Sequence, residues 1–275
     1  MSNLIKRSLS GLVFLAVTIG CLLCPYGYAV LMLFVTVAAA VETGAMLVPG
    51  RRYVREKVLV TLSCAASFIL CFLCFSFGFP PRFIIAALLP LIASYILLLF
   101  NSSTDYDFPA GIFFPVPYIA VPVCCSLFLA YPGGNFTGKL LLLTLVLIWS
   151  CDVGAYCFGM MFGQREGSRK LFPALSPKKS WAGAVGGFVC TMIAAVTVAA
   201  FANTEIPLIH WIVMALIVST VGIFGDLFES LLKRHAGVKD SGNIIPGHGG
   251  MLDRFDGFFF VIPTIVVYLK LFDMI

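Results

Sequence analysis

The stretch "KLLLLTLVLIWSCDVGAYCFGMMF", Lys139–Phe162, decides the fold class of this chain. It is almost entirely apolar, with Asp152 as its single acid. A helix needs about 20 such residues to cross the hydrocarbon core of a bilayer. Inside hydrocarbon the backbone must satisfy its own N–H and C=O groups, which an α-helix does. The stretch is therefore predicted to be a membrane-spanning α-helix.

The composition of the whole chain extends this prediction. Of the 275 residues, 60% are hydrophobic and only 11% are charged. A soluble domain is usually about half apolar and about a quarter charged. We therefore expect an all-α, polytopic integral membrane protein, because only that class is compatible with this balance.

Nine apolar stretches are long enough to be considered as membrane spans, although the first and the last are short. They are roughly Leu9–Cys24, Tyr26–Val48, Val58–Phe79, Phe83–Phe100, Ile112–Tyr131, Lys139–Phe162, Gly183–Ala202, Ile206–Leu232 and Phe258–Leu271.

The distribution of basic residues predicts the orientation of these spans. With a cytoplasmic N-terminus, Arg82, Lys139 and Lys270 are the only basic residues on the outer side, and the other 15 of the 18 Lys and Arg residues face the cytoplasm. Cytoplasmic loops of membrane proteins carry such an excess. We expect residues 1–137 to form a transmembrane scaffold and residues 138–275 a catalytic region, with cytoplasmic loops at 163–182 and 233–257.

Acidic residues within apolar segments mark the working half of the chain. A carboxylate at mid-bilayer costs about 2.5–3.5 kcal/mol, so such residues are functional candidates. Asp226, Glu229 and Lys233 follow i, i+3, i+7 spacing and share one helix stripe. Asp253 and Asp256 form a second pair. Converging carboxylates suit a hard cation such as Mg2+; the alternative is that they only form salt bridges with neighbouring basic residues.

Two polar loops contain residue types that bind phosphate. The segment "SPKKS", Ser176–Ser180, precedes a helix expected to start near Trp181, and a helix N-terminus with hydroxyl and ammonium donors favours phosphate. The glycines of "GHGG", Gly247–Gly250, allow a close backbone approach to a ligand, or form a plain turn. His248 is either an acid–base or phosphate donor or a loop histidine without such a role.

The segment "SLLKRHAGVKDSGNIIPGHGGMLDRFD", Ser230–Asp256, closely resembles the signature of the CDP-diacylglycerol synthases (phosphatidate cytidylyltransferases). Further similar segments are "DVGAYCFG", Asp152–Gly159, and "LFPALSPKKSWAG", which has Ser180 where Thr is common and Ala182 where Glu is common. The fixed positions of the signature that match are Ser230, Lys233, Arg234, Lys239, Asp240, Gly242, Pro246, His248, Gly249, Gly250, Asp253, Arg254 and Asp256.

The resemblance implies an enzyme that transfers CMP from CTP to phosphatidic acid, giving CDP-diacylglycerol and pyrophosphate, at the cytoplasmic membrane face. It implies Asp226, Asp253 and Asp256 as Mg2+ ligands, and Lys233 as a catalytic residue beside the carboxylates or the phosphate. Whether a second cation binds stays open. The implied contacts to the two substrates are Ser176, Lys178, Lys179, Ser180, Arg234, Lys239, His248, Gly249, Gly250 and Arg254.

Other readings of the chain are a transporter, a different membrane transferase and a non-catalytic homologue. The polar residues gather at one rim and no internal repeat is found, which argues against a transport pathway. Expected partners are CTP, phosphatidic acid and membrane lipids, without nucleic acid, and the expected location is the inner (plasma) membrane of a bacterium. Rows of small residues, Gly159–Gly163 and Gly183–Gly187, permit close helix packing. That packing is either within one chain or in a homodimer.

Overall fold

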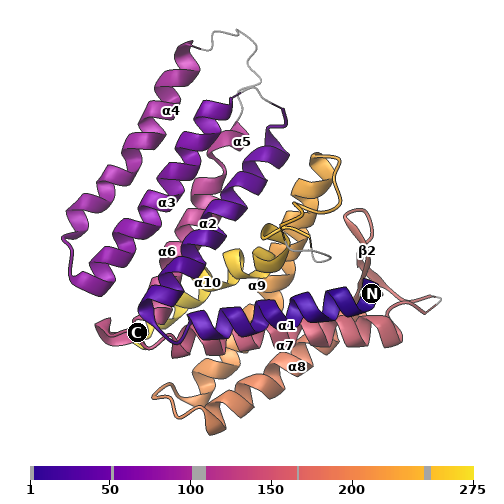
Figure 1. Cartoon of the computed structure of the whole chain (residues 1–275). Helices are drawn as coiled ribbons and strands as arrows, with labels where there is room; N and C mark the ends of the chain where they lie inside the picture. Colours follow the sequence, from indigo (N-terminus) through magenta and orange to yellow (C-terminus); the bar gives the residue numbers. More distant parts are fainter. Residues whose placement is uncertain (1–2, 51–52, 101–109, 166, 245–248) are drawn as a thin grey trace. The chain divides into compact units, whose positions relative to one another are not determined.

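The computed structural model of the chain describes residues 3–50, 53–100, 110–165, 167–244 and 249–275 (Figure 1). The chain divides into two compact units. The first comprises Met1–Gly138 and His235–Phe255, and the second comprises Lys139–Arg234 and Asp256–Ile275. Each unit is described by itself.

The described elements of the first unit are all helices. Its helices α2 and α3 pack side by side (Figure 1). Its elements are α1 (Asn3–Cys21), α2 (Pro25–Leu47), α3 (Val54–Phe77), η1 (Pro81–Ala87), α4 (Leu88–Phe100), α5 (Ala110–Phe113), η2 (Val116–Ala120), α6 (Val121–Ala130) and η3 (Pro132–Gly134).

Proline explains why one predicted span of this unit is an irregular helix. The stretch expected at Ile112–Tyr131 consists of α5, a π-helical turn η2 and α6. Pro115, Pro117 and Pro122 lie in it, and each lacks the N–H that a continuous helix would use. The hydroxyl oxygens of Tyr28 on α2 and Ser126 on α6 lie 2.7 Å apart, and this buried hydrogen bond ties α6 to α2.

The second unit consists of α7 (Lys139–Phe162), a hairpin of β1 (Lys170–Phe172) and β2 (Ser176–Ser180), α8 (Trp181–Phe201), most of α9 (Leu208–His235) and most of α10 (Leu252–Leu271). The two strands pair antiparallel, with Lys170 opposite Ser180 and Phe172 opposite Ser176.

Glycines bring α7 and α8 into close contact within one chain. A Cβ added at Gly154 would lie 2.7 Å from the carbonyl oxygen of Gly186, and one at Gly183 would lie 2.9 Å from that of Ala155. Neither distance leaves room for a side chain. The rows of small residues therefore pack against each other inside this molecule, as small residues do where membrane helices approach closely.

The structure confirms the all-α, polytopic fold class. Among the described residues, seven helical stretches are long and apolar enough to cross a membrane, and Ser10–Cys21 is a shorter apolar helix. The span predicted at Lys139–Phe162 has the bounds of α7. α10 carries Asp253, Arg254, Asp256 and Lys270 and is not one of the seven. The count of nine spans, the cytoplasmic N-terminus and the division at residue 137 stay predictions.

Candidate active site

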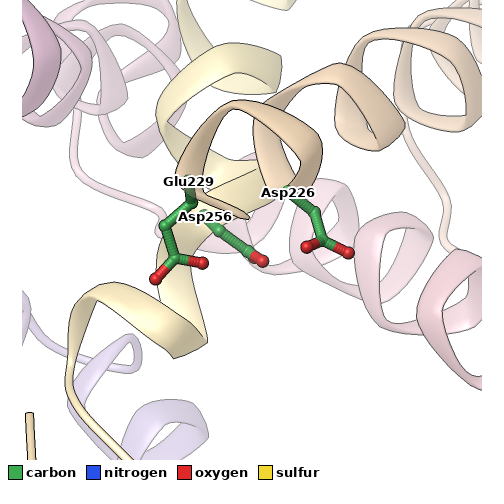
Figure 2. Close-up of side chains that lie close together, drawn as sticks. All are labelled: Asp226, Glu229 and Asp256. Carbon is green, nitrogen blue, oxygen red and sulfur yellow. The ribbon is translucent and has the colours of Figure 1, made fainter. Parts of the chain in front are cut away.

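Three carboxylates of the second unit lie together. Asp226 and Glu229 come from α9 and Asp256 comes from α10 (Figure 2). One carboxylate oxygen of each lies within 4.8 Å of the others. Glu229 is fully buried, whereas the two aspartates are half-buried. Oxygen donors at this spacing are the ligands that hard divalent cations prefer, so this acidic cluster could hold a metal ion.

A glycine on α9 explains how the cluster forms. Gly225 is buried, and a Cβ added to it would lie 2.7 Å from the carbonyl oxygen of Asp256 and 3.2 Å from the Cα of Gly257. The two helix backbones therefore cross in contact at this point. Asp226 follows Gly225 directly, and Glu229 is three residues further on the same helix face. The crossing brings both side chains to the first turns of α10.

Two lysines reach the acidic cluster. The Nζ of Lys179, on β2, forms an ion pair with Oδ2 of Asp226. The Nζ of Lys233, one turn along α9, lies 3.1 Å from Oε2 of Glu229. Among the described ion pairs, two ammonium groups thus face three carboxylates. Such an arrangement retains negative charge for a cation and places positive charge beside it for a phosphate.

The hairpin that carries Lys179 is tied to the ends of its neighbouring helices. Gln164 Nε2 donates to the carbonyl oxygen of Lys178 at 2.9 Å, and Lys170 Nζ donates to that of Gly163 at 2.7 Å. Ser180 ends β2, and its Oγ accepts a hydrogen bond from the N–H of Gly183 at 3.2 Å, capping α8. The expected start of a helix at Trp181 is therefore confirmed, whereas the strands before it were not predicted.

The neighbouring lysines of β2 provide a matched pair for a prediction. Lys179 is half-buried on Asp226, whereas Lys178 is exposed. We expect Lys179→Met to lower kcat/KM for CTP, the substrate that the sequence resemblance implies, about 30-fold, because losing a charge-assisted contact costs about 2 kcal/mol. We expect Lys178→Met to lower it less than about fivefold. Steady-state pyrophosphate release at constant ionic strength measures both, and equal losses would contradict this placement of Lys179.

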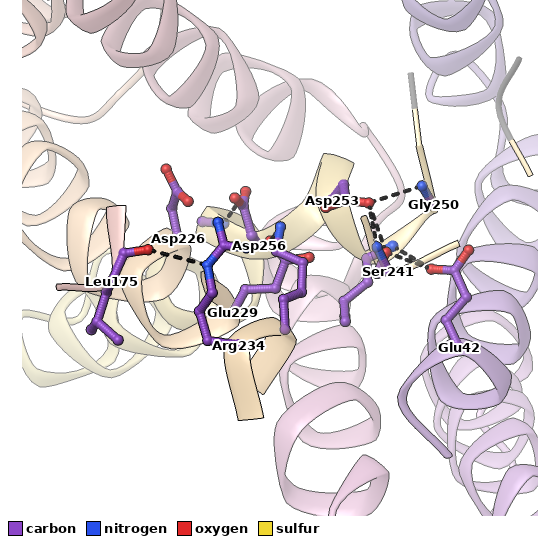
Figure 3. A network of polar contacts seen from close by, with 12 residues as sticks. Glu42, Leu175, Asp226, Glu229, Arg234, Ser241, Gly250, Asp253 and Asp256 are labelled. Atoms are coloured by element: carbon purple, nitrogen blue, oxygen red, sulfur yellow. Dashed lines mark hydrogen bonds and ion pairs between the residues drawn. The ribbon is translucent and has the colours of Figure 1, made fainter. Parts of the chain in front are cut away.

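A second polar network lies in the first unit, at the start of α10 (Figure 3). Oδ2 of Asp253 accepts hydrogen bonds from the N–H groups of Ser241 and Gly250, both at 2.9 Å, and from Ser241 Oγ at 2.8 Å. The carboxylate of Glu42, on α2, accepts from the N–H of Met251 at 2.9 Å and that of Leu252 at 2.8 Å.

The predicted site residues are thus distributed over both units. Asp226, Asp256, Lys179 and Lys233 lie in or on the acidic cluster. Asp253 belongs to the first unit with Gly249 and Gly250, and its role as a metal ligand stays a prediction. His248 lies outside the described residues. Of the remaining predicted residues, Ser180 is buried and Ser176 is half-buried. The others are exposed: Lys178, Arg234, Lys239 and Arg254.

Two acids that are not among the predicted site residues belong to these networks. Glu229 completes the acidic cluster. Its i+3 spacing pairs it with Asp226 as a cation candidate, but the metal ligands implied by the resemblance leave it out. Glu42 contacts residues about 200 positions away in the chain. Its position inside an apolar span showed that it was unusual, but the sequence could not show its partner.

The fold and these two networks define a class: a polytopic membrane protein with carboxylates and lysines gathered at the ends of its C-terminal helices. The family profile described as the cytidylyltransferase family matches residues 5–272, and the chain belongs to this family.

Curated relatives agree with this assignment. The chain is 48% identical over 128 residues to a phosphatidate cytidylyltransferase of Bacillus subtilis (strain 168), a match that covers 46% of each chain. It is 44% identical over 129 residues to one of Staphylococcus saprophyticus, covering 47% of this chain and 48% of the relative. The matched part thus spans about half the length of these relatives. With seven long apolar helices in its described part and bacterial relatives, the chain fits a multi-pass protein of a bacterial plasma membrane.

Proposed function

We propose that the protein is a CTP:phosphatidate cytidylyltransferase. A phosphate oxygen of phosphatidic acid attacks the α-phosphorus of CTP and forms a new phosphorus–oxygen bond. The bond between the α-phosphorus and the oxygen bridging to the β-phosphorus breaks, and pyrophosphate leaves with that electron pair. The products are CDP-diacylglycerol and pyrophosphate. The names of the relatives and the family membership support this choice of substrates.

The observation that carries the proposal is the acidic cluster of Asp226, Glu229 and Asp256 with its two lysines. Three carboxylates within 4.8 Å fit a hard divalent cation, and we propose Mg2+, which binds through a few carboxylates and substrate phosphates. The cation would neutralise charge on the phosphate oxygens during transfer. Asp226, Glu229 and Asp256 would hold it.

The lysines have a separate part in this proposal. Lys179 and Lys233 pair with carboxylates in the structure, and each can turn its ammonium group to a phosphate oxygen that arrives beside the cluster. Phosphoryl-type transfer depends mainly on positioning and on stabilising charge, so cations aimed at the reacting phosphates account for much of the expected rate. The positive-inside distribution supports CTP delivery at the cytoplasmic face, while phosphatidic acid would enter from the bilayer.

Pyrophosphate release by the purified protein in detergent tests the reaction. We expect release that requires phosphatidic acid, CTP and Mg2+ together. Removing divalent cations with EDTA should lower the rate at least about a hundredfold, since metal-bound charge stabilisation contributes several kcal/mol. Excess Mg2+ should restore it. ATP in place of CTP, diacylglycerol in place of phosphatidic acid, and heat-denatured protein are the controls.

The outcomes separate the parts of the proposal. Pyrophosphate release that needs CTP but not phosphatidic acid would show that the acceptor of the CMP group is a different molecule. Release unaffected by EDTA would remove the metal from the proposal. A folded protein that releases no pyrophosphate with all components present would overturn the function itself.

A further inference from the structure

Glu42 is a buried carboxylate that no part of the signature includes. It lies on α2, among the apolar residues of a predicted span, and is only 6% exposed. Its Oε1 accepts from the N–H of Met251, and its Oε2 accepts from the N–H of Leu252. Ser241 Oγ lies 3.2 Å from Oε2 of Glu42 and 2.8 Å from Oδ2 of Asp253, so its single proton is shared between two carboxylates.

We propose that Glu42 is a positioning residue for the reaction: it holds Ser241, Met251 and the first turn of α10 in the geometry that catalysis needs. This inference rests on the proposed function for its kinetic part only. Leu252 is the first residue of α10, and its N–H is one that no intrahelical acceptor can satisfy. Glu42 supplies the acceptor from another helix, where the positive end of the α10 dipole favours a negative charge.

The glycines of the signature leave room for this carboxylate. A Cβ added at Gly250 would lie 2.6 Å from both carboxylate oxygens of Glu42 and would also meet Ser241 Oγ. A Cβ at Gly242 would lie 2.8 Å from Cδ of Glu42. Glycine is therefore required at these two positions by the close approach of the Glu42 side chain. Their contact with substrate stays a separate prediction.

The connection to the chemistry runs along α10. Asp256 is four residues, about one turn, beyond Leu252 on the same helix. Asp253 is itself held by the N–H groups of Ser241 and Gly250. A change in the start of α10 therefore moves Asp253 and Asp256, the two signature aspartates on this helix. Misplacement of a reacting group by about 1 Å can cost about a hundredfold in rate.

Glu42→Gln tests the proposal with little change in volume. The amide can still accept through its oxygen, but its NH2 group faces a backbone N–H and leaves that donor unsatisfied. Thr43→Val is the matched control, because Thr43 is also buried on α2 and its hydroxyl donates to the carbonyl oxygen of Ala39 in its own helix at 2.8 Å.

Two readouts are compared between these variants. Hydrogen–deuterium exchange of peptides covering Gly249–Arg254 is expected to be about tenfold faster in Glu42→Gln, since one such hydrogen bond contributes about 1.4 kcal/mol. The kcat is expected to fall about a hundredfold, with KM for CTP within about threefold of wild type. Thr43→Val should leave both readouts near wild type.

Each other result counts against the proposal or against the function, and the two are distinguishable. Unchanged exchange in Glu42→Gln, equal effects in Thr43→Val, or faster exchange without loss of kcat would each overturn the positioning role. If Glu42→Gln does not fold, Glu42→Asp decides: it keeps the charge but is one methylene shorter, which pulls the carboxylate away from the N–H groups of Met251 and Leu252. Unchanged exchange and unchanged kcat in Glu42→Asp would overturn the proposal. If the wild-type protein has no activity, the proposed function fails. The hydrogen–deuterium exchange difference between wild type and Glu42→Gln needs no substrate and still tests the positioning role.

Discussion

Replacing Asp256 by asparagine is expected to lower kcat/KM about a thousandfold. The substitution keeps the shape of the side chain and removes one of the three carboxylates of the acidic cluster. A bound cation contributes several kcal/mol of charge stabilisation, and each 1.36 kcal/mol is a factor of ten in rate. The loss should appear in kcat, because the proposed cation would act mainly in the transition state.

Thermal unfolding in detergent separates loss of the cation site from loss of the fold. Wild-type protein is expected to unfold at a higher temperature with added Mg2+, because a ligand that binds the native state stabilises it. Asp256→Asn should fold without metal and lose this Mg2+-dependent shift. Asp273→Asn, an exposed aspartate beyond the end of α10, is the control and should keep both activity and shift. An unchanged Mg2+ shift in Asp256→Asn would place the cation elsewhere.

Gly225→Ala, which adds a single methyl group, is expected to lower kcat substantially although it changes no polar side chain. The new Cβ of Gly225→Ala would lie 2.7 Å from the carbonyl oxygen of Asp256, which is backbone and cannot turn away. α9 and α10 must separate, so the three carboxylates no longer share one point. We expect kcat to fall about 10- to 100-fold, with a loss of about 1–3 kcal/mol in stability from overpacking.

Gly222→Ala is the matched control on the same helix. Its added Cβ would lie 3.5 Å from Cγ2 of Val261, an ordinary contact. Alanine is the better helix former by about 1 kcal/mol, so stability should be kept or raised and activity retained. Thermal unfolding and pyrophosphate release of the two variants provide the comparison. Equal behaviour of the two would show that the helix crossing at Gly225 does not set the site.

Much of the site follows from residues close in sequence. The i, i+3, i+7 spacing of Asp226, Glu229 and Lys233 places them on one helix face, and the structure has all three there, with Lys233 on Glu229. The carboxylate pair at the start of α10 was likewise visible as a motif. The partner of Lys179 was not, because an ion pair between a strand and a helix depends on how the hairpin folds back.

The sequence alone determined the fold class, since apolar runs of bilayer length allow only helices in hydrocarbon. It also determined the family-like signature and the start of α8, because a capping serine acts on the next few residues. Only the tertiary structure decided that the glycine rows of α7 and α8 meet within one chain, that Glu229 completes the cluster, and that Glu42 holds the first turn of α10. These depend on which helices meet and at what height, and local spacing does not encode contacts between distant segments.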